Sequence, residues 1–365
     1  MKTALITGGA GYLGTHLAKA LKQAGYTTIC IDKKSTDCKY YDIRHQCDVR
    51  SLDRLEYIFN NARKIDVVFH LAGRIEVGES WTESEEFWNT NVGGTSNVLK
   101  LMKQYGIKNI VYSSTAAVYE SSKAPLTESH PIALKNPYAR TKYAAETAIQ
   151  DSGLNAVIFR YFNLAGADPD CEMGENHEPE THLIPLLFKN LNNFAINGND
   201  YDTFDGTCVR DYVHVSDVAD AHVLAATYLE TNDGVRILNL GTGTGFSILE
   251  IVRTAISVLH VHMKKWHFVE RRKGDPDSLV ADVSLAKQVL KYNPKHNIIS
   301  ILQTAYAWNN KHNEEKTTPQ LQVILEALHK DEAAIFAQLI QKKFKVKGLT
   351  IALVKEAFPE LDLGV

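Results

Sequence analysis

A tyrosine and a lysine four residues apart, Tyr138 and Lys142, are the side chains in this sequence best suited to acid–base chemistry. In a helix, residues i and i+4 lie on one face. An ammonium group beside a phenol favours the phenolate, so the phenol's pKa falls from about 10 toward neutrality and it can act as a general base. Hydroxyls at Ser113, Ser114 and Thr115 end a predicted strand about 20 residues upstream, at the edge where α/β folds bind ligands.

A glycine-rich segment, Gly8-x-x-Gly11-x-x-Gly14, follows the first predicted strand and opens the first predicted helix. Its glycines permit a tight turn and let a pyrophosphate approach the helix N-terminus. Asp32 ends the next strand about 20 residues after this loop, where a carboxylate binds the hydroxyls of an adenosine ribose. The pattern favours NAD over NADP, because a 2′-phosphate would meet a negative charge. The two lysines that follow Asp32 leave NADP open.

Strand-like and helical segments alternate in the first half of the chain. The strand-like segments are rich in Val, Ile and aromatic residues and cover 3–7, 28–31, 67–71, 110–113 and 156–161. Helical periodicity covers 13–24, 51–60, 88–105 and 138–151. This order predicts right-handed βαβ units, and therefore an α/β fold with a Rossmann-type, doubly wound parallel sheet.

The chain divides into three expected regions. Residues 1–162 are predicted to form an NAD-binding Rossmann domain, with a return to the sheet around 206–240. A smaller α/β substrate-binding domain is expected mainly from 163–312, where strand-like 194–197 and 237–240 alternate with helical 215–229 and 248–259. Residues 313–365 are expected to form a helical C-terminal extension of unknown role, with helices over 319–343 and 349–358.

Composition excludes several classes of protein. The 365 residues are 44% apolar and 23% charged with a net charge of −3, a globular profile too near neutral for a nucleic-acid partner. Five scattered cysteines without a CxxC pair predict reduced thiols and a cytoplasmic location. No segment reads as a signal peptide or membrane span. His177 and His182 lie among acids but lack metal-motif spacing, so no metal site is predicted.

Several further motifs together resemble those of the extended short-chain dehydrogenase/reductases. They are Thr7 to Gly14, Leu71-Ala-Gly73, Val77 to Ser80, Asn91 to Thr95, the Tyr138/Lys142 pair, Arg160-Tyr-Phe-Asn163 and Gly206 to Val215. Within that family the chain is most similar to the UDP-glucose 4-epimerases, over about residues 2–312. Ala116 and Ala117 stand where related dehydratases carry an acidic pair, which favours simple epimerisation.

The resemblance implies a catalytic set, a cofactor site and a substrate site. Thr115 and Tyr138 would be the catalytic pair, and Lys142 would position the nicotinamide ribose and lower the Tyr138 pKa. The implied NAD contacts are Gly8, Gly11, Tyr12, Leu13, Gly14, Asp32, Asp48, Val49, Leu71, Ala72, Gly73, Asn91, Ser113 and Phe162, with Tyr138 and Lys142. The implied UDP-sugar contacts are Thr115, Asn163, Leu183, Ala195, Ile196, Arg210, Arg272, Asp275 and Leu279.

The implied activity is an isomerase reaction, the NAD-dependent interconversion of UDP-glucose and UDP-galactose through a transient 4-keto sugar. Leu279, His182 and Ile75 depart from the family pattern. A 4-epimerase of UDP-N-acetylhexosamines or UDP-pentoses therefore stays open, because position 279 gates the acetamido group. A non-catalytic dinucleotide-binding regulator is a further alternative. The family also implies a homodimer, formed here through 88–105 and 138–151.

Overall fold

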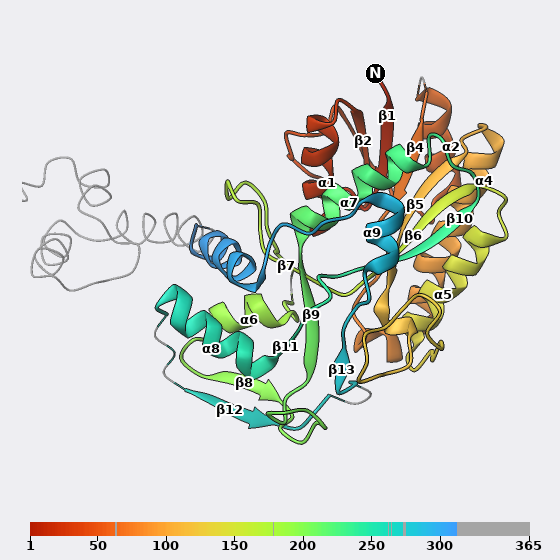
Figure 1. The fold of residues 1–365 in the computed structure, drawn as a ribbon. Helices are drawn as coiled ribbons and strands as arrows, with labels where there is room; N and C mark the ends of the chain where they lie inside the picture. Colours follow the sequence, from red (N-terminus) through yellow and green to blue (C-terminus); the bar gives the residue numbers. More distant parts are fainter. Residues whose placement is uncertain (63, 178, 262, 264, 273–274, 312–365) are drawn as a thin grey trace, which may run out of the picture. The chain divides into compact units, whose positions relative to one another are not determined.

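A seven-stranded parallel sheet forms the centre of the fold, in the strand order β10-β6-β5-β4-β1-β2-β3 (Figure 1). The computed structural model describes residues 1–311 except 63, 178, 262, 264 and 273–274. The strands are β1 (Thr3–Thr7), β2 (Thr27–Asp32), β3 (Ile43–Gln46), β4 (Val67–His70), β5 (Asn109–Thr115), β6 (Asn155–Tyr161) and β10 (Val235–Leu240). This order confirms the predicted Rossmann-type sheet, and its carboxyl edge is where such folds bind ligands.

Helices cover both faces of the sheet because successive strand residues point to opposite sides. On β1, Ala4 and Ile6 pack with α1 (Tyr12–Gln23), α7 (Val215–Tyr228) and α9 (Ser284–Leu290). Leu5 lies between them and packs with α2 (Leu52–Asn61), α4 (Gly94–Gln104) and α5 (Pro137–Gln150). The two apolar layers hold α1 and α5, the helices that carry the glycine loop and the Tyr138/Lys142 pair, on opposite faces.

The helix predicted over 88–105 is instead two segments, a π-helical stretch η2 (Trp88–Gly93) followed by α4, and the short helix α3 (Ser84–Phe87) precedes them. The extra residue per turn in a π-helix shifts the helical register, a feature common at functional sites. Here the π-helical stretch contains Asn91, which is 1% exposed. The 3.6-residue periodicity of the sequence carries no sign of this shift.

A smaller set of strands stands beside the main sheet. β9 (Val209–His214) pairs with β7 (Asn163–Ala165), β11 (Gly245–Ser247) and β13 (Ser278–Leu279). β8 (Phe194–Asn197) pairs with β12 (Trp266–Val269), near α6 (Leu183–Lys189) and α8 (Ile248–Leu259) (Figure 1). The short helices η1 (Glu79–Trp81) and η3 (Ala116–Val118) complete the elements named here. The sequence predicts that the chain returns to the main sheet around 206–240. In this range β10 does lie in the main sheet, whereas β9 lies in the second set of strands.

The chain separates into two units, 1–305 and 306–365. In the second unit only 306–311 are described, and they are helical. The helices predicted over 319–343 and 349–358 lie outside the described residues. Within the part of the chain that the structure describes, every helix falls short of the length and apolar content needed to cross a bilayer.

Three histidines, His70, His214 and His222, are fully buried in the core. Burial lowers their pKa values to about 3, 3 and 4, whereas an unfolded histidine titrates near 6.5. Because the folded pKa is lower than the unfolded one, the unfolded state binds a proton at each histidine first as the pH falls. The stability that each neutral histidine contributes is therefore complete above about pH 6.5 and is lost as the pH falls below that value. Between the folded and unfolded pKa values, each such histidine lowers the free energy of unfolding by about 1.4 kcal/mol for each pH unit of acidification.

We expect His222→Gln to reduce the acid sensitivity of the fold. Between pH 7 and pH 5.5, the free energy of unfolding of the wild type should fall by roughly 1 kcal/mol more than that of the variant. The comparison isolates His222, because raised pKa values at His177 and His182 act in the opposite direction in both proteins. Urea unfolding at the two pH values measures it, and equal losses in both proteins would contradict the assignment.

Candidate active site

The glycine loop between β1 and α1 is packed too closely for side chains. Gly8 has a φ of +72°, and a Cβ there would lie 2.7 Å from the backbone nitrogen of Ala72. A Cβ on Gly14 would lie 2.5 Å from the carbonyl oxygen of Gly8. Gly11 is the N-cap of α1 and makes no side-chain cap. The helix N-terminus is therefore open to an anion, and the loop fits the pyrophosphate of a dinucleotide.

Tyr12 and Leu13, also predicted to contact the pyrophosphate, have side chains engaged within the protein. The Tyr12 hydroxyl donates to the carbonyl oxygen of Gly166 at 2.6 Å, and burial raises the pKa of this phenol. Leu13 packs against the core on the α1 face of the sheet. Tyr12 thereby ties the glycine loop to the segment that follows β7.

Asp32 ends β2 beside the glycine loop, where the sequence places the adenosine ribose. One carboxylate oxygen accepts from the backbone of Ala10 at 3.0 Å and the other from the backbone of Lys34 at 2.8 Å. These bonds fix the carboxylate at the loop. Lys33 and Lys34 are exposed at the surface.

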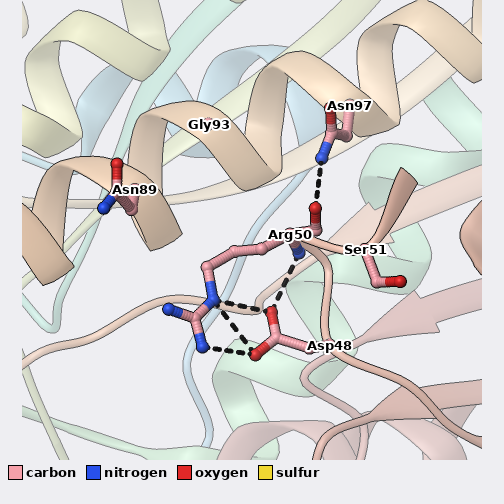
Figure 2. Close-up of a pocket in the computed structure, with 6 residues that line it drawn as sticks. All are labelled: Asp48, Arg50, Ser51, Asn89, Gly93 and Asn97. Atoms are coloured by element: carbon pink, nitrogen blue, oxygen red, sulfur yellow. Dashed lines mark hydrogen bonds and ion pairs between the residues drawn. The ribbon is translucent and has the colours of Figure 1, made fainter. Parts of the chain in front are cut away.

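A pocket of about 580 Å³ opens beside Asp48. Figure 2 shows its six lining residues, Asp48, Arg50, Ser51, Asn89, Gly93 and Asn97. Arg50 holds the Asp48 carboxylate at 2.8 Å and lowers its pKa, and Asn97 donates to the carbonyl oxygens of Val49 and Arg50 at 3.1 Å.

Asn91 holds the segment after β4 against α5. Its side-chain oxygen accepts from the backbone of Arg74 at 2.8 Å, and its amide donates to Thr141 at 2.9 Å. A Cβ on Gly73 would lie 3.0 Å from that oxygen and 3.6 Å from the ammonium of Lys142. Asn91 thus positions the backbone over 71–75 close to Lys142. Leu71 and Ala72 are fixed in turn by bonds from their amides to Thr7.

The structure brings Thr115 and Tyr138 together at the carboxyl edge of the sheet. Asn136 caps α5 by accepting from the backbone of Ala139 at 2.8 Å, which starts the helix one residue before Tyr138. The Thr115 hydroxyl oxygen accepts from the backbone of Ala117 at 3.1 Å, and the Thr115 side chain lies close enough to Tyr138 to lower the pKa of its phenol. The two hydroxyl groups therefore lie near one another before any substrate arrives.

The predicted lowering of the Tyr138 pKa by Lys142 is wrong for the protein alone. Burial raises the pKa of Tyr138 to about 12, against the opposing effect of the Thr115 hydrogen bond. Burial also lowers the pKa of Lys142 to about 8, with the ammonium 4.7 Å from the centre of the Tyr112 ring. Both groups lose hydration, and desolvation favours the neutral form of each. The tyrosine is a phenol at neutral pH until further positive charge reaches it.

Ser113 lies in a buried network that the sequence did not indicate. Its hydroxyl donates to the Tyr161 hydroxyl at 2.8 Å, which lies 2.6 Å from Nε2 of His222. Burial raises the pKa of Tyr161. Tyr161 belongs to one of the family motifs, but its partners are 48 and 61 residues away, so only the fold joins them.

On the substrate side, β9 and β13 bring Arg210, Asp275 and Leu279 together. Arg210 donates to the Asp275 carboxylate at 2.6 Å and to the carbonyl oxygen of Pro276 at 2.8 Å. Leu279 pairs with Arg210 across the two strands. Tyr201, which the sequence reasoning missed, donates to the other Asp275 oxygen at 3.3 Å. An arginine and a carboxylate held this way offer one group to a phosphate and one to a sugar hydroxyl.

The remaining predicted substrate and cofactor residues are spread along this side of the chain. Asn163, Ala195 and Arg272 are exposed, and Leu183 is the first residue of α6. Ile196 is only 1% exposed, so its side chain belongs to the core. Phe162 packs in a small apolar cluster that also contains Ala116 and Leu279. Position 279 is therefore in contact with the group of residues around η3.

Ile75, which stands where the family usually has lysine, is 39% exposed. Its neighbour Arg74 does not supply the missing charge to Tyr138. The Arg74 guanidinium pairs with Glu79 at 2.9 Å and Glu83 at 2.6 Å, and it lies 4.9 Å from the centre of the Phe87 ring.

Comparison with known proteins agrees with this geometry. The model of the NAD dependent epimerase/dehydratase family matches residues 4–241. A UDP-glucose 4-epimerase of Rhizobium meliloti is 40% identical over 322 residues, which are 85% of this chain and 98% of the relative. One of Lacticaseibacillus casei is 39% identical over 326 residues, 86% and 98% of the two chains.

Solved structures agree as well. UDP-glucose 4-epimerase of Brucella ovis in complex with NAD has a TM-score of 0.80 at 36% identity, covering 85% of this chain and 99% of that one. The enzyme of Bifidobacterium longum in complex with NAD+ and UDP has a TM-score of 0.80 at 33% identity, covering 86% and 99%. The chain belongs to the NAD dependent epimerase/dehydratase family.

Proposed function

We propose that this protein is an NAD-dependent UDP-glucose 4-epimerase that interconverts UDP-glucose and UDP-galactose. The observation that carries the proposal is the meeting of Thr115, the last residue of β5, with Tyr138 of α5, the helix that also carries Lys142. They meet at the sheet edge of a chain about 40% identical to such enzymes along almost their whole length. The cofactor residues are the glycine loop, Asp32, and the groups around Gly73 and Asn91.

Each group has a distinct task. Bound NAD supplies the reversible hydride acceptor that inversion at a carbinol carbon needs. Once the positive charge of bound NAD favours its phenolate form, Tyr138 takes the proton of the sugar 4-hydroxyl and returns it, with Thr115 orienting that hydroxyl. Lys142 keeps a positive charge near the cofactor ribose and the phenol. Arg210 and Asp275 hold the UDP end, so the 4-keto sugar can turn and present its other face.

Purified full-length protein with UDP-galactose and no added NAD tests the proposal. We expect UDP-glucose to form, because the cycle consumes no cofactor, and we expect denaturation to release NAD rather than NADP. Turnover would also dispose of the alternative that the chain is a non-catalytic dinucleotide-binding regulator. Absence of turnover with every UDP-hexose and UDP-pentose would refute the proposal.

We also propose a cytoplasmic homodimer. All five cysteines lie among the described residues, and none of them forms a disulfide, as expected in a reducing compartment. For the dimer, α4 and α5 lie on one face of the sheet, and Trp81 and Trp88, shortly before α4, are 56% and 41% exposed. Sedimentation velocity of the full chain distinguishes dimer from monomer.

A second candidate activity is epimerisation of UDP-N-acetylhexosamines or UDP-pentoses. One solved relative, at 30% identity, is a UDP-Glc/GlcNAc 4-epimerase of Campylobacter jejuni, and another, at 31%, was solved with formylated UDP-arabinopyranose. The feature of this chain that bears on the choice is Leu279, a side chain of intermediate size that is half-buried beside Phe162.

Substitution of Leu279 should change the preference between sugars in opposite directions. Leu279→Ala should raise the ratio of turnover with UDP-N-acetylgalactosamine to turnover with UDP-galactose by roughly tenfold, and Leu279→Tyr should lower it, because a pocket discriminates by the volume it leaves. The kcat/KM values for both sugars measure the ratio. Equal ratios in the two variants would show that position 279 is no gate.

A further inference from the structure

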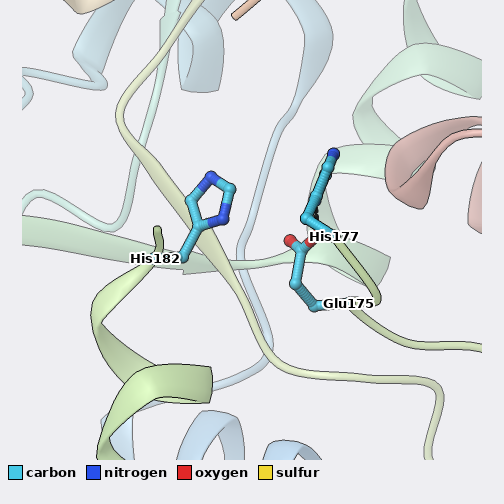
Figure 3. Close-up of side chains that lie close together, drawn as sticks. All are labelled: Glu175, His177 and His182. Carbon is cyan, nitrogen blue, oxygen red and sulfur yellow. Dashed lines mark hydrogen bonds and ion pairs between the residues drawn. The ribbon is translucent and has the colours of Figure 1, made fainter. Parts of the chain in front are cut away.

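The segment between β7 and α6 contains three side chains of the types that ligate metals, and one of them, His182, directly precedes the predicted substrate contact Leu183. A carboxylate oxygen of Glu175 and one ring nitrogen each of His177 and His182 lie within 4.8 Å of one another. Figure 3 shows the Glu175 carboxylate next to His177, with the His182 imidazole across from them. We refer to Glu175, His177 and His182 as the loop cluster.

The two imidazoles are spaced as a shared ion would require. Their ring centroids are 5.4 Å apart. Two imidazoles on one tetrahedral ion at Zn–N distances of about 2.1 Å have ring centres roughly 5 Å apart. Tetrahedral ligand atoms lie about 3.4 Å from one another, so small side-chain rotations bring the three donors into coordination.

A second carboxylate, that of Glu180, is hydrogen-bonded to the cluster through His182 and has one oxygen without a hydrogen-bond partner among the described residues. Glu180 is bonded through Oε1 to Nδ1 of His182 at 2.9 Å, and its side chain is 3% exposed. Its other oxygen, Oε2, is buried and finds no hydrogen-bond partner among the described residues. A buried carboxylate oxygen without a partner needs an explanation, and a cation held by the adjacent histidines supplies one.

The first part of this segment, residues 166–170, is anchored to α1 before any ion binds. Lys19 on α1 pairs with Asp168 at 2.8 Å and Asp170 at 2.9 Å, and Tyr12 holds Gly166. A site on a fixed loop loses little conformational entropy when it binds.

We propose that the loop cluster binds one divalent transition ion of the zinc type, with Glu180 as a fourth ligand or as the group that orients His182. Two imidazoles with one or two carboxylates match Zn²⁺ and its neighbours, whereas Mg²⁺ and Ca²⁺ prefer all-oxygen sites. The ion would offset the charges of Glu175 and Glu180 beside the segment that leads into α6.

Titration of chelator-treated, full-length protein with Co²⁺ tests the proposal, followed by displacement with Zn²⁺. We expect one equivalent to bind with the visible absorption of tetrahedral cobalt, and Mg²⁺ not to compete. Binding by Glu180→Gln should be at least about tenfold weaker. His177→Gln with His182→Gln should remove stoichiometric binding, whereas His45→Gln, a matched change on β3, should bind as the wild type does.

Circular dichroism shows whether each variant is folded. Three results would overturn the proposal: binding of less than one equivalent of Co²⁺ by the wild type, wild-type affinity in the double variant, or a thiolate-to-metal absorption band. The first two would mean that the loop cluster is two independent imidazole–carboxylate pairs, and the third would mean that the ion binds a cysteine. Neither NAD nor a UDP-sugar enters the titration, so the outcome is separate from that of the epimerase assay.

Discussion

Tyr138→Phe should lower kcat for epimerisation by about 10²- to 10⁴-fold, the usual contribution of a positioned general acid–base group. The substitution removes one hydroxyl and keeps the ring, which packs edge-on to Phe87 with centroids 6.4 Å apart. The fold and the glycine loop should therefore be unaffected, and the variant should be purified with NAD still bound. Kinetics with UDP-galactose and analysis of the released nucleotide measure the two effects separately.

Tyr143→Phe is the matched control for this experiment. Tyr143 lies on the same helix, α5, and packs partly buried against the small cluster around Phe162. Its hydroxyl has no place in the proposed proton transfer, so this variant should turn over at the wild-type rate. Wild-type turnover by Tyr138→Phe would show that another group moves the proton, and Thr115 would be the next residue to test.

The sequence predicts those parts of the fold that are determined by residues close together along the chain. β1, the glycine loop and α1 follow one another within about 20 residues, and each has its own pattern, so their arrangement could be predicted as a unit. The same holds for α5, where Pro137 at the first turn and Asn136 as cap mark the start of the helix that carries Tyr138. Periodicity and capping are properties of neighbouring residues.

The parts that could not be predicted depend on pairing between distant segments. β9 and β13 place Arg210 against Asp275, 65 residues further along the chain. His222 reaches Tyr161 only because α7 packs across the sheet. The π-helical turn at Asn91 was missed for a related reason, since the inward contacts of Asn91 with Arg74 and Thr141 lie outside the helix itself.

The direction of the Tyr138 pKa shift is a property of the active site that the sequence could not predict, for the same reason. The spacing of Tyr138 and Lys142 gives the sign of their mutual interaction, but the degree of burial is a property of the whole fold. Burial raises the pKa of the phenol and lowers that of the ammonium, and in this protein it is the largest contribution to both shifts. The loop cluster could not be foreseen either, because its donors meet only through the path of the chain between β7 and α6.

Arg160→Met should cost about 3–5 kcal/mol of the free energy of unfolding, the loss typical when one partner of a buried ion pair is removed. Arg160 on β6 is 3% exposed and Glu146 on α5 is fully buried. The guanidinium donates to Oε2 of Glu146 at 2.6 Å and to Oε1 at 3.1 Å, and Ser114 is bonded to the same carboxylate. The variant leaves a buried carboxylate without its cation. Urea unfolding at pH 7 measures the loss.

A second substitution at the partner tests whether the cost comes from that stranded charge. Glu146→Gln combined with Arg160→Met should recover part of the stability lost by Arg160→Met alone, because no unpaired charge then remains in the core. Lys123→Met, which breaks an ion pair with both side chains about three-quarters exposed, should have no measurable effect. An additive double variant would place the cost in lost packing of Arg160 on the Tyr119 ring. Because Glu146 follows Lys142 by one turn, recovery would identify the ion pair as a link that holds α5, the helix of Tyr138 and Lys142, against β6.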